Sequence, residues 1–360
     1  MLDKGKRKFI VACGGTGGHA FPGLAVAKEL SRRGHEVVVW MSGRDIESSV
    51  LKQGWEGATF STGARQLRPK YLISLFTSLW RCRRELRRFQ PAALLAMGSY
   101  SSLPPVLAAR SCSVKVVLHE ANTVPGRAVE WLSHFADKVA ISFETTANAF
   151  PKNKTVLTGL PVRNEIALGK RFDFIPAGSF TVFVTGGSQG AHRVNELMTE
   201  ALLAVKKELK ARGETTRPLY VIHQTGAKDE EWVKAAYAEA DIPARVHAFE
   251  NEMADAFASA DLVVARAGAS TCFELAAAAK PAFLIPLPSA MRDHQHWNAE
   301  AFAAKGAADE GVQAKLSAAA IARYILHRRA EPGHLAVMAE KMRLLARPDA
   351  AAKVADLLTE

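Results

Sequence analysis

Two glycine-rich segments each follow a short apolar run and precede a helix-forming stretch. In the first, Gly15-Thr-Gly-Gly-His-Ala20 matches the GxGxxA pattern, and the second reads Gly186-Gly-Ser-Gln-Gly-Ala191. Glycine lets the backbone approach a phosphate closely, and the N-terminus of the following helix supplies free N–H groups and positive potential. The sequence therefore predicts two phosphate-binding turns. Tight strand–helix turns that hold no ligand are the alternative.

A dinucleotide site would also need an acidic residue near the end of the next strand, where it binds a ribose. After the first turn that strand ends at Trp40-Met-Ser42, and no acid follows before Asp45. After the second turn it ends at residues 222–226, again without an acid. A nicotinamide-dependent oxidoreductase is therefore disfavoured, and we expect no cofactor.

A carboxylate follows a third apolar run. Small residues occupy a turn at 265–271, and Glu274 is expected in the first turn of the helix that follows. A carboxylate in that position could complement the helix dipole. Alternatively, it accepts both hydroxyls of a ribose whose phosphates lie on the neighbouring glycine-rich turn.

A proline-broken loop at 286–292 leads into the polar cluster Asp293-His-Gln-His-Trp-Asn298, which opens another helix. Histidine, glutamine and asparagine can donate hydrogen bonds to sugar hydroxyls and to a leaving diphosphate without adding negative charge. Simple capping of the helix N-terminus is the other explanation.

These segments need elements to position them, and apolar runs alternate with helical periodicity along nearly the whole chain. We expect strands at 9–13, 36–40, 92–97, 115–119, 138–141 and 155–158, and then at 180–185, 219–223, 245–248, 262–265 and 282–285. Continuous apolar strands separated by helices are typical of parallel α/β sheets that are covered on both faces. Because the strand–turn–helix opening occurs twice, we expect two Rossmann-like, doubly wound domains facing a cleft.

The domain boundaries follow from the second opening. We expect an N-terminal domain at 1–163, completed by a C-terminal helix at 346–360, and a C-terminal domain at 164–345. Residues 159–179 contain prolines and glycines and are expected to form the linker. A chain of 360 residues exceeds the usual size of one hydrophobic core, which agrees with two domains.

The net charge of +11 is unevenly distributed. Residues 1–163 contain 24 Lys and Arg against 11 Asp and Glu, whereas the rest of the chain contains 23 against 25. The positive excess therefore lies in the first half and indicates an anionic partner there. No known nucleic-acid motif accompanies it, so we expect no nucleic-acid partner.

Cysteine usage and hydropathy restrict the compartment and the kind of site. The four cysteines (Cys13, Cys82, Cys112 and Cys272) form no CxxC pair, so we expect a reducing compartment and no metal site. Neither a signal peptide nor a membrane-spanning stretch is evident, which indicates a soluble, cytoplasmic protein.

Residues 71–91 show the periodicity of an amphipathic helix. Its buried stripe is expected to consist of Leu72, Leu75, Phe76, Leu79, Cys82 and Leu86. Apolar and basic side chains suit the interface of an anionic bilayer, although a solvated basic face is the ordinary explanation. The residues expected to contact the membrane are Leu72, Ile73, Phe76, Trp80, Arg81, Arg84, Arg87 and Arg88.

Six motifs occur in order along nearly the whole chain, at 14–25, 119–126, 159–163, 186–191, 266–274 and 293–299. Together they resemble those of the MurG family of bacterial peptidoglycan glycosyltransferases. The resemblance implies a B-type glycosyltransferase fold with the donor on the C-terminal domain and a lipid acceptor on the N-terminal one. Residues 97–104 depart from it, because many relatives carry more glycine there.

The family resemblance implies transfer of N-acetylglucosamine from UDP-N-acetylglucosamine to undecaprenyl-linked lipid I, with inversion, to give lipid II. Such an enzyme acts in peptidoglycan synthesis, and thereby in cell-wall biogenesis, cell shape and cell division. It would lie peripherally on the cytoplasmic side of the inner membrane, on its anionic surface. The alternatives are another UDP-sugar transferase with a lipid acceptor and a non-catalytic basic adaptor.

The resemblance also implies residue roles. Glu274 would bind the ribose, and Arg163 with the backbone around Phe249 and Glu250 would lie near the uracil. The full set of implied donor contacts is Thr16, Gly17, Gly18, Asn122, Arg163, Ser188, Gln189, Phe249, Glu250, Ala269, Ser270, Thr271, Glu274, His294 and Gln295. The implied acceptor contacts are Gly14, Gly15, Thr16, Gly17, Gly18, His19 and Tyr100.

An acceptor hydroxyl needs a general base, and a histidine with an ordinary pKa of about 6.5 suits this role near neutrality. His19 lies at the mouth of the first glycine-rich turn and is our first candidate. It could instead bind phosphate or cap the helix. Glu120 is the second candidate, although a carboxylate at a strand end could simply hold a neighbouring loop.

Overall fold

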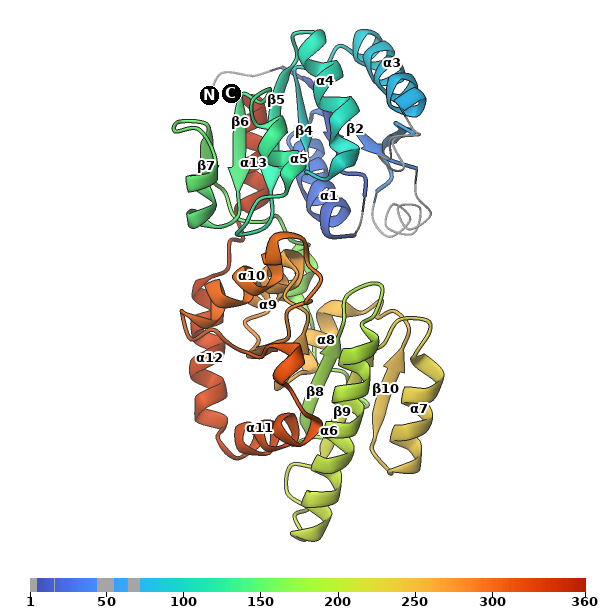
Figure 1. The fold of residues 1–360 in the computed structure, drawn as a ribbon, viewed down its shortest axis with the longest axis vertical. Helices are drawn as coiled ribbons and strands as arrows, with labels where there is room; N and C mark the ends of the chain where they lie inside the picture. The colour runs from blue at the N-terminus through green and yellow to red at the C-terminus, as the bar shows by residue number, and fades with distance from the viewer. Residues whose placement is uncertain (1–4, 16, 44–54, 64–71) are drawn as a thin grey trace. The chain divides into compact units, whose positions relative to one another are not determined.

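The computed structural model describes residues 5–15, 17–43, 55–63 and 72–360, with only the backbone of Leu72 and Ile73. The chain forms two compact units (Figure 1). Unit 1 comprises residues 1–163 and 347–360, and unit 2 comprises residues 164–346.

Unit 1 is built on a parallel sheet with the strand order β3-β2-β1-β4-β5-β6-β7. The strands are β1 (Lys8–Ala12), β2 (Glu36–Met41), β3 (Ala58–Ser61), β4 (Ala93–Ala96), β5 (Lys115–Glu120), β6 (Lys138–Ile141) and β7 (Thr155–Leu157). The helices are α1 (Gly17–Arg32), α3 (Leu72–Phe89), α4 (Leu103–Ser111), α5 (Arg127–Leu132) and α13 (Ala350–Thr359), with short 3-10 turns η2 (Tyr100–Ser102) and η3 (Glu144–Ala149).

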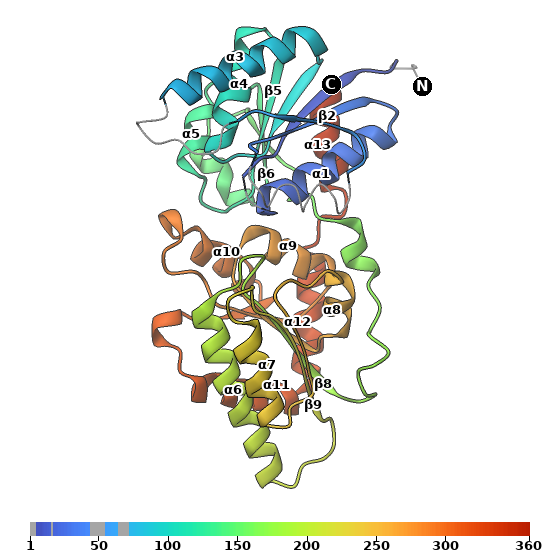
Figure 2. The same ribbon diagram turned by 90° about the vertical axis from the view of Figure 1, so that its right-hand side faces the viewer.

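Both faces of this sheet are covered, which explains why its strands are continuously apolar. Phe9 and Val11 of β1 pack with α1 and α13 on one face. Ile10 and Ala12, the alternate residues, pack with α3, α4 and α5 on the other face. α1 and α13 lie side by side (Figure 2).

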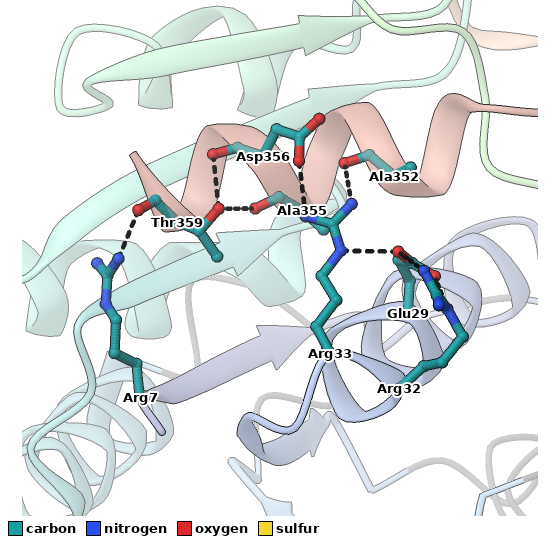
Figure 3. A network of polar contacts seen from close by, with 8 residues as sticks. All are labelled: Arg7, Glu29, Arg32, Arg33, Ala352, Ala355, Asp356 and Thr359. Atoms are coloured by element: carbon teal, nitrogen blue, oxygen red, sulfur yellow. Dashed lines mark hydrogen bonds and ion pairs between the residues drawn. The ribbon is translucent and has the colours of Figure 1, made fainter. Parts of the chain in front are cut away.

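The C-terminal helix α13 is fixed to unit 1 by apolar and polar contacts. Val354 and Leu358 lie in the core beside α1. Arg33 at the end of α1 pairs with Asp356 at 2.6 Å and donates to the Ala352 carbonyl at 3.2 Å, while Arg7 donates to the Thr359 carbonyl (Figure 3). The last residues of the chain therefore complete the first unit.

Unit 2 repeats this architecture with the order β10-β9-β8-β11-β12-β13. The strands are β8 (Phe180–Thr185), β9 (Leu219–Gln224), β10 (Ala244–His247), β11 (Leu262–Ala265), β12 (Ala282–Leu284) and β13 (Ala308–Glu310). The helices are α6 (His192–Ala211), α7 (Glu230–Glu239), α8 (Met253–Ser259), α9 (Ala269–Ala277), α10 (His294–Ala303), α11 (Ala318–Ala330) and α12 (Pro332–Leu344), with η4 (Asn164–Leu168), η5 (Met291–Asp293) and η6 (Gln313–Lys315). α6 and α11 pack together against the sheet (Figure 2).

In each sheet the strand order reverses beside the first strand of the unit. The reversal lies between β1 and β4 in unit 1 and between β8 and β11 in unit 2. Ligands of doubly wound sheets bind at the carboxyl ends of the strands at this switch point. The predicted α/β class with two doubly wound parallel sheets is confirmed, and the topology identifies where each unit can bind a ligand.

Two expectations about local structure are wrong. The expected linker at 159–179 contains the boundary between the units but is too long, because residues 164–179 belong to unit 2, where Ile166, Phe172 and Ile175 are buried. Phe76 does not belong to the buried stripe of α3, since 72% of its surface is exposed, whereas Cys82 and Leu86 are buried as expected. The side chains of Leu72 and Ile73 lie outside the described residues.

Candidate functional site

The first glycine-rich turn packs closely against its neighbours. A Cβ on Gly14 would lie 2.4 Å from the backbone nitrogen of Ser42, so only glycine fits there. The Gly14 carbonyl accepts a hydrogen bond from Ser101 Oγ at 2.7 Å. α1 then begins at Gly17, which is buried, and Gly18 is half-buried. Thr16 lies outside the described residues.

The segment after β4 forms the other wall of this switch point. Ser99 has φ 68° and ψ 162°, a conformation essentially restricted to glycine. Its Oγ accepts a hydrogen bond from the Ser101 backbone N–H at 3.2 Å. Tyr100 is exposed. The departure from the glycine-rich family pattern is therefore a site of backbone strain.

His19 lies between these two walls. A Cβ built on Gly15 would be 3.8 Å from His19 Nδ1, and one built on Gly98 would be 3.8 Å from His19 Cδ2. The imidazole is half-buried in the first turn of α1. It is thus held where the carboxyl ends of β1 and β4 meet, which is where a ligand of unit 1 is expected.

His119 and Glu120 end β5, and both are buried. His119 Nε2 lies 3.1 Å from the Gly159 carbonyl, and burial lowers the pKa of His119 to about 4. His119 is therefore neutral at pH 7, with Nε2–H as the donor. We gave it no role from the sequence, where its burial could not be seen.

Glu120 makes three hydrogen bonds to the segment that follows. Its Oε1 accepts from the backbone N–H of Asn122 at 2.9 Å and from Asn122 Nδ2 at 3.2 Å, and its Oε2 accepts from the Gly126 N–H at 3.0 Å. Burial raises the pKa of Glu120 to about 7 despite these donors. The contacts favour the loop-holding role over that of a base.

Arg163, another implied donor contact, lies in unit 1 with its guanidinium carbon 4.6 Å from the centre of the Phe21 ring.

The second glycine-rich turn connects β8 to α6. The Gly190 N–H donates to the Gly187 carbonyl at 2.9 Å and closes the turn, and Ser188 and Gln189 are exposed at its tip. A Cβ on Gly190 would lie 2.0 Å from the Thr225 carbonyl oxygen, and its φ is 72°. Glycine is thus required by both space and conformation. The turn presents the N-terminus of a 20-residue helix, which suits a diphosphate.

The segment after β11 lies next to this turn because β11 pairs with β8. It contains Ala269, which is buried, and Ser270, Thr271 and Glu274, which are half-buried. The prediction that Glu274 lies in the first turn of its helix is wrong, since α9 begins at Ala269 and Glu274 is its sixth residue. The dipole effect falls off within the first turn, so helix stabilisation does not explain this carboxylate.

The polar cluster at α10 holds neighbouring loops. Gln295 Oε1 accepts from the Leu287 N–H at 3.0 Å, and Asn298 Nδ2 donates to the Ala267 carbonyl at 3.1 Å. His294 Nδ1 donates to the Met291 carbonyl at 2.8 Å. These contacts do not cap α10, so the capping explanation is not supported. Arg292 and Asp293 both have φ 54°, which is strained for non-glycine residues and marks this loop as a constrained one.

Two arginines support unit 2 and were given no role from the sequence. Arg266 is buried and donates to the carbonyls of Ile285 and Pro286 at 3.1 Å and to Gln313 at 2.6 Å. These bonds connect the turn between β11 and α9 to the segment that follows β12 and to η6. Arg245 makes two bonds to the buried Glu250 carboxylate, at 2.8 and 3.0 Å. The segment with Phe249 and Glu250 is therefore fixed at the end of β10.

α3 presents aromatic and basic side chains to solvent. Trp80, 62% exposed, lies one turn after the exposed Phe76, and the guanidinium of Arg84 lies 5.6 Å from the centre of the Trp80 ring. Arg81, Arg87 and Arg88 are also exposed.

Within the described ranges, no helix combines the length and apolar character needed to cross a membrane. No group of three or more His, Cys, Asp or Glu suited to a metal ion occurs among those residues.

Comparison with known proteins adds to this geometry. The Glycosyltransferase family 28 N-terminal domain matches residues 9–141, and the Glycosyltransferase family 28 C-terminal domain matches residues 181–354. A relative from Geobacter sulfurreducens is 39% identical over 97% of both chains, and one from Stutzerimonas stutzeri is 39% identical over 98% of both. Both are named UDP-N-acetylglucosamine–N-acetylmuramyl-(pentapeptide) pyrophosphoryl-undecaprenol N-acetylglucosamine transferase.

Among solved structures, that of Acinetobacter baumannii MurG is similar, with a TM-score of 0.77 and 29% identity over 98% of this chain and 99% of that one. The similarity covers both units, which agrees with the two-domain fold expected from the sequence.

Proposed function

The chain belongs to glycosyltransferase family 28, and we propose that it transfers N-acetylglucosamine from UDP-N-acetylglucosamine to the N-acetylmuramyl sugar of undecaprenyl-pyrophosphoryl-N-acetylmuramyl-pentapeptide, converting lipid I to lipid II. The observation that carries the proposal is likeness over almost the entire length to transferases named for this donor and acceptor. The two glycine-rich turns, each at the N-terminus of a helix, support it, because both substrates contain a diphosphate.

We assign the donor chiefly to unit 2. The N-terminus of α6, with Ser188 and Gln189, binds the diphosphate and stabilises the negative charge that develops on departing UDP. Glu274 accepts hydrogen bonds from the ribose hydroxyls. The backbone of Phe249 and Glu250 binds the uracil. The other donor contacts are Ala269, Ser270, Thr271, His294 and Gln295, together with Thr16, Gly17, Gly18, Asn122 and Arg163 of unit 1.

We assign the acceptor to unit 1. The turn formed by Gly14, Gly15, Gly17 and Gly18, with Thr16, binds its pyrophosphate at the N-terminus of α1, and Tyr100 lies on the other wall. His19 takes the proton from the acceptor hydroxyl as that oxygen attacks the anomeric carbon, and UDP leaves in the same step with inversion. Glu120 holds the segment 122–126 rather than moving the proton.

Contact with the membrane follows from the acceptor's lipid. We propose that Phe76 and Trp80 enter the interface of the anionic inner leaflet, beside the arginines of α3 and with Leu72 and Ile73. Each exposed arginine adds attraction to anionic headgroups. The enzyme then acts as a peripheral protein on the cytoplasmic side, where its UDP-linked donor is available. The excess of positive charge in residues 1–163 supports this orientation.

A transfer assay tests the function. The purified chain is incubated with labelled UDP-N-acetylglucosamine and a short-chain lipid I analogue, and the disaccharide product is separated and its anomeric configuration determined. We expect a β-linked disaccharide. Transfer from a different UDP-sugar only would favour another UDP-sugar transferase, and transfer from none would contradict the proposal.

A matched pair of variants tests the base. We expect His19→Ala to lower kcat by a factor of about 10² to 10⁴ while leaving the donor KM nearly unchanged. His134, an exposed histidine elsewhere in unit 1, provides the control, and His134→Ala should retain full activity. Equal activity of the two variants would exclude His19 as the base.

A further inference from the structure

Gln224 connects two segments that belong to different strands. It ends β9, which lies between β8 and β10 in the sheet of unit 2. Its Nε2 donates to the Gly187 carbonyl at 2.7 Å, and its Oε1 accepts from the Glu250 N–H at 3.1 Å. The side chain is only 1% exposed. One buried amide therefore bridges the turn after β8 and the segment after β10.

Both ends of this bridge are themselves fixed. The Gly187 carbonyl also accepts the N–H of Gly190, so the same oxygen closes the turn and receives the Gln224 amide. On the other side, the Glu250 carboxylate is held by Arg245, and it also accepts the N–H of Glu252 at 2.9 Å. A change in the length or chemistry of the Gln224 side chain would therefore be transmitted to both segments.

An amide side chain satisfies both hydrogen-bonding groups that face position 224. It must donate toward one backbone carbonyl and accept from one backbone N–H, and glutamine supplies one group of each kind. A carboxylate would direct a lone pair at the Gly187 carbonyl. An apolar side chain would leave the buried N–H of Glu250 without its partner, and the Gly187 carbonyl would keep only the Gly190 N–H. An unpaired buried N–H is costly.

We propose that Gln224 is a positioning residue that sets the spacing between the diphosphate-binding turn at 186–190 and the uracil-binding segment at Phe249 and Glu250. The inference rests on the proposed donor site. A ligand that contacts both segments, such as UDP, depends on their spacing. A ligand that contacts only one, such as uridine, depends on it much less. Gln224 therefore acts on the affinity for the whole nucleotide without touching it.

Calorimetry on the full-length chain tests this, with UDP titrated directly and uridine measured by displacement. We expect Gln224→Met to raise the Kd for UDP about tenfold or more, because the buried Glu250 N–H loses its partner and the bridge to the Gly187 carbonyl is broken. The Kd for uridine should change much less. In the transfer assay KM for UDP-N-acetylglucosamine should rise because the donor contacts both segments.

Gln224→Glu provides a second and sharper test. When protonated, the introduced carboxyl can donate to the Gly187 carbonyl and accept from the Glu250 N–H, as the amide does. When ionised it cannot donate, so the ratio of its Kd for UDP to the wild-type Kd should rise with increasing pH. Burial raises the pKa of such a carboxyl and brings the change toward neutral pH.

The control is Tyr237→Phe, which removes the hydroxyl 2.9 Å from His223 Nδ1 on the same strand without touching either segment. It should lower thermal stability and leave the UDP affinity unchanged. The inference is overturned if Gln224→Met binds UDP as wild type does, if it weakens UDP and uridine equally, or if the Gln224→Glu ratio is independent of pH. Failure of the wild-type protein to bind UDP would instead contradict the proposed function.

Discussion

Glu274 offers the most specific prediction about the donor site. It is half-buried in the second turn of α9, beside the glycine-rich turn that follows β8. Because the helix dipole does not account for a carboxylate at this position, we assign it to the ribose. The perturbation is Glu274→Ala, measured with two ligands, UDP and 2′-deoxy-UDP, that differ by a single hydroxyl.

The expected magnitude follows from the hydrogen bond that is lost. A hydrogen bond from a hydroxyl to a charged carboxylate contributes about 1.5–3 kcal/mol. Wild type should therefore bind UDP roughly ten to a hundred times more tightly than 2′-deoxy-UDP. Glu274→Ala removes the carboxylate to which the 2′-hydroxyl of UDP would donate. The Kd values for UDP and for 2′-deoxy-UDP should therefore become nearly equal, and both should exceed the wild-type Kd for UDP.

Calorimetry gives the four Kd values, and thermal unfolding shows whether the variant retains its fold. Glu274→Gln is a useful companion, since an amide can still accept one bond and should keep part of the discrimination. The ribose assignment is wrong if Glu274→Ala distinguishes UDP from 2′-deoxy-UDP by the same factor as wild type. That result would mean that the carboxylate does not contact the 2′-hydroxyl.

Three further predictions concern other parts of the chain. Phe76→Ser combined with Trp80→Ser should weaken binding to phosphatidylglycerol vesicles by tenfold or more, because two exposed aromatic side chains no longer enter the interface. Trp131→Ser, at a 48% exposed position on α5, should not weaken it. Vesicle flotation measures the binding, and an equal loss in both variants would contradict the prediction. Burial lowers the pKa of His223 to about 3. As the pH falls below about 6.5, this histidine therefore binds a proton in the unfolded chain but not in the folded one. Its contribution should lower the free energy of unfolding by about 1.4 kcal/mol for each unit by which the pH falls. Urea unfolding between pH 6 and 4 should show a smaller slope for His223→Gln, and identical slopes would refute this. Ser99→Gly should raise the free energy of unfolding by about 1 kcal/mol because glycine adopts this backbone conformation without strain; a decrease in urea unfolding would count against it.

Much of the fold could be predicted because buried parallel strands are continuously apolar. The runs at 138–141, 180–185 and 262–265 match the observed strands, and the others differ by one residue at one or both ends. Two edge strands were missed. β3 is largely exposed, and β13 has only three residues, two of them acidic, so neither has the apolar run that a strand covered on both faces requires.

Less of the site could be predicted, because side-chain partners depend on which strands become neighbours. The glycine-rich turns were evident from local spacing. The roles of Gln224 and Arg266 were not evident from the sequence. The hydrogen-bond partners of Gln224 lie 37 and 26 residues away. Those of Arg266 lie 19, 20 and 47 residues away. Glu274 was expected one turn too early because the start of α9 depends on how residues 266–268 leave β11. The available signal for Gln224 was a polar residue at the end of a mostly apolar strand, and for Arg266 it was an arginine directly after the apolar strand β11.

We propose that the turn after β8, and not the one after β1, holds the nucleotide's diphosphate. Amide hydrogen exchange of the full-length chain, with and without saturating UDP, tests it directly. We expect UDP to slow exchange at residues 186–191 and 268–274 of unit 2. Slower exchange confined to residues 13–19 of unit 1, or no change in either turn, would contradict this assignment of the diphosphate.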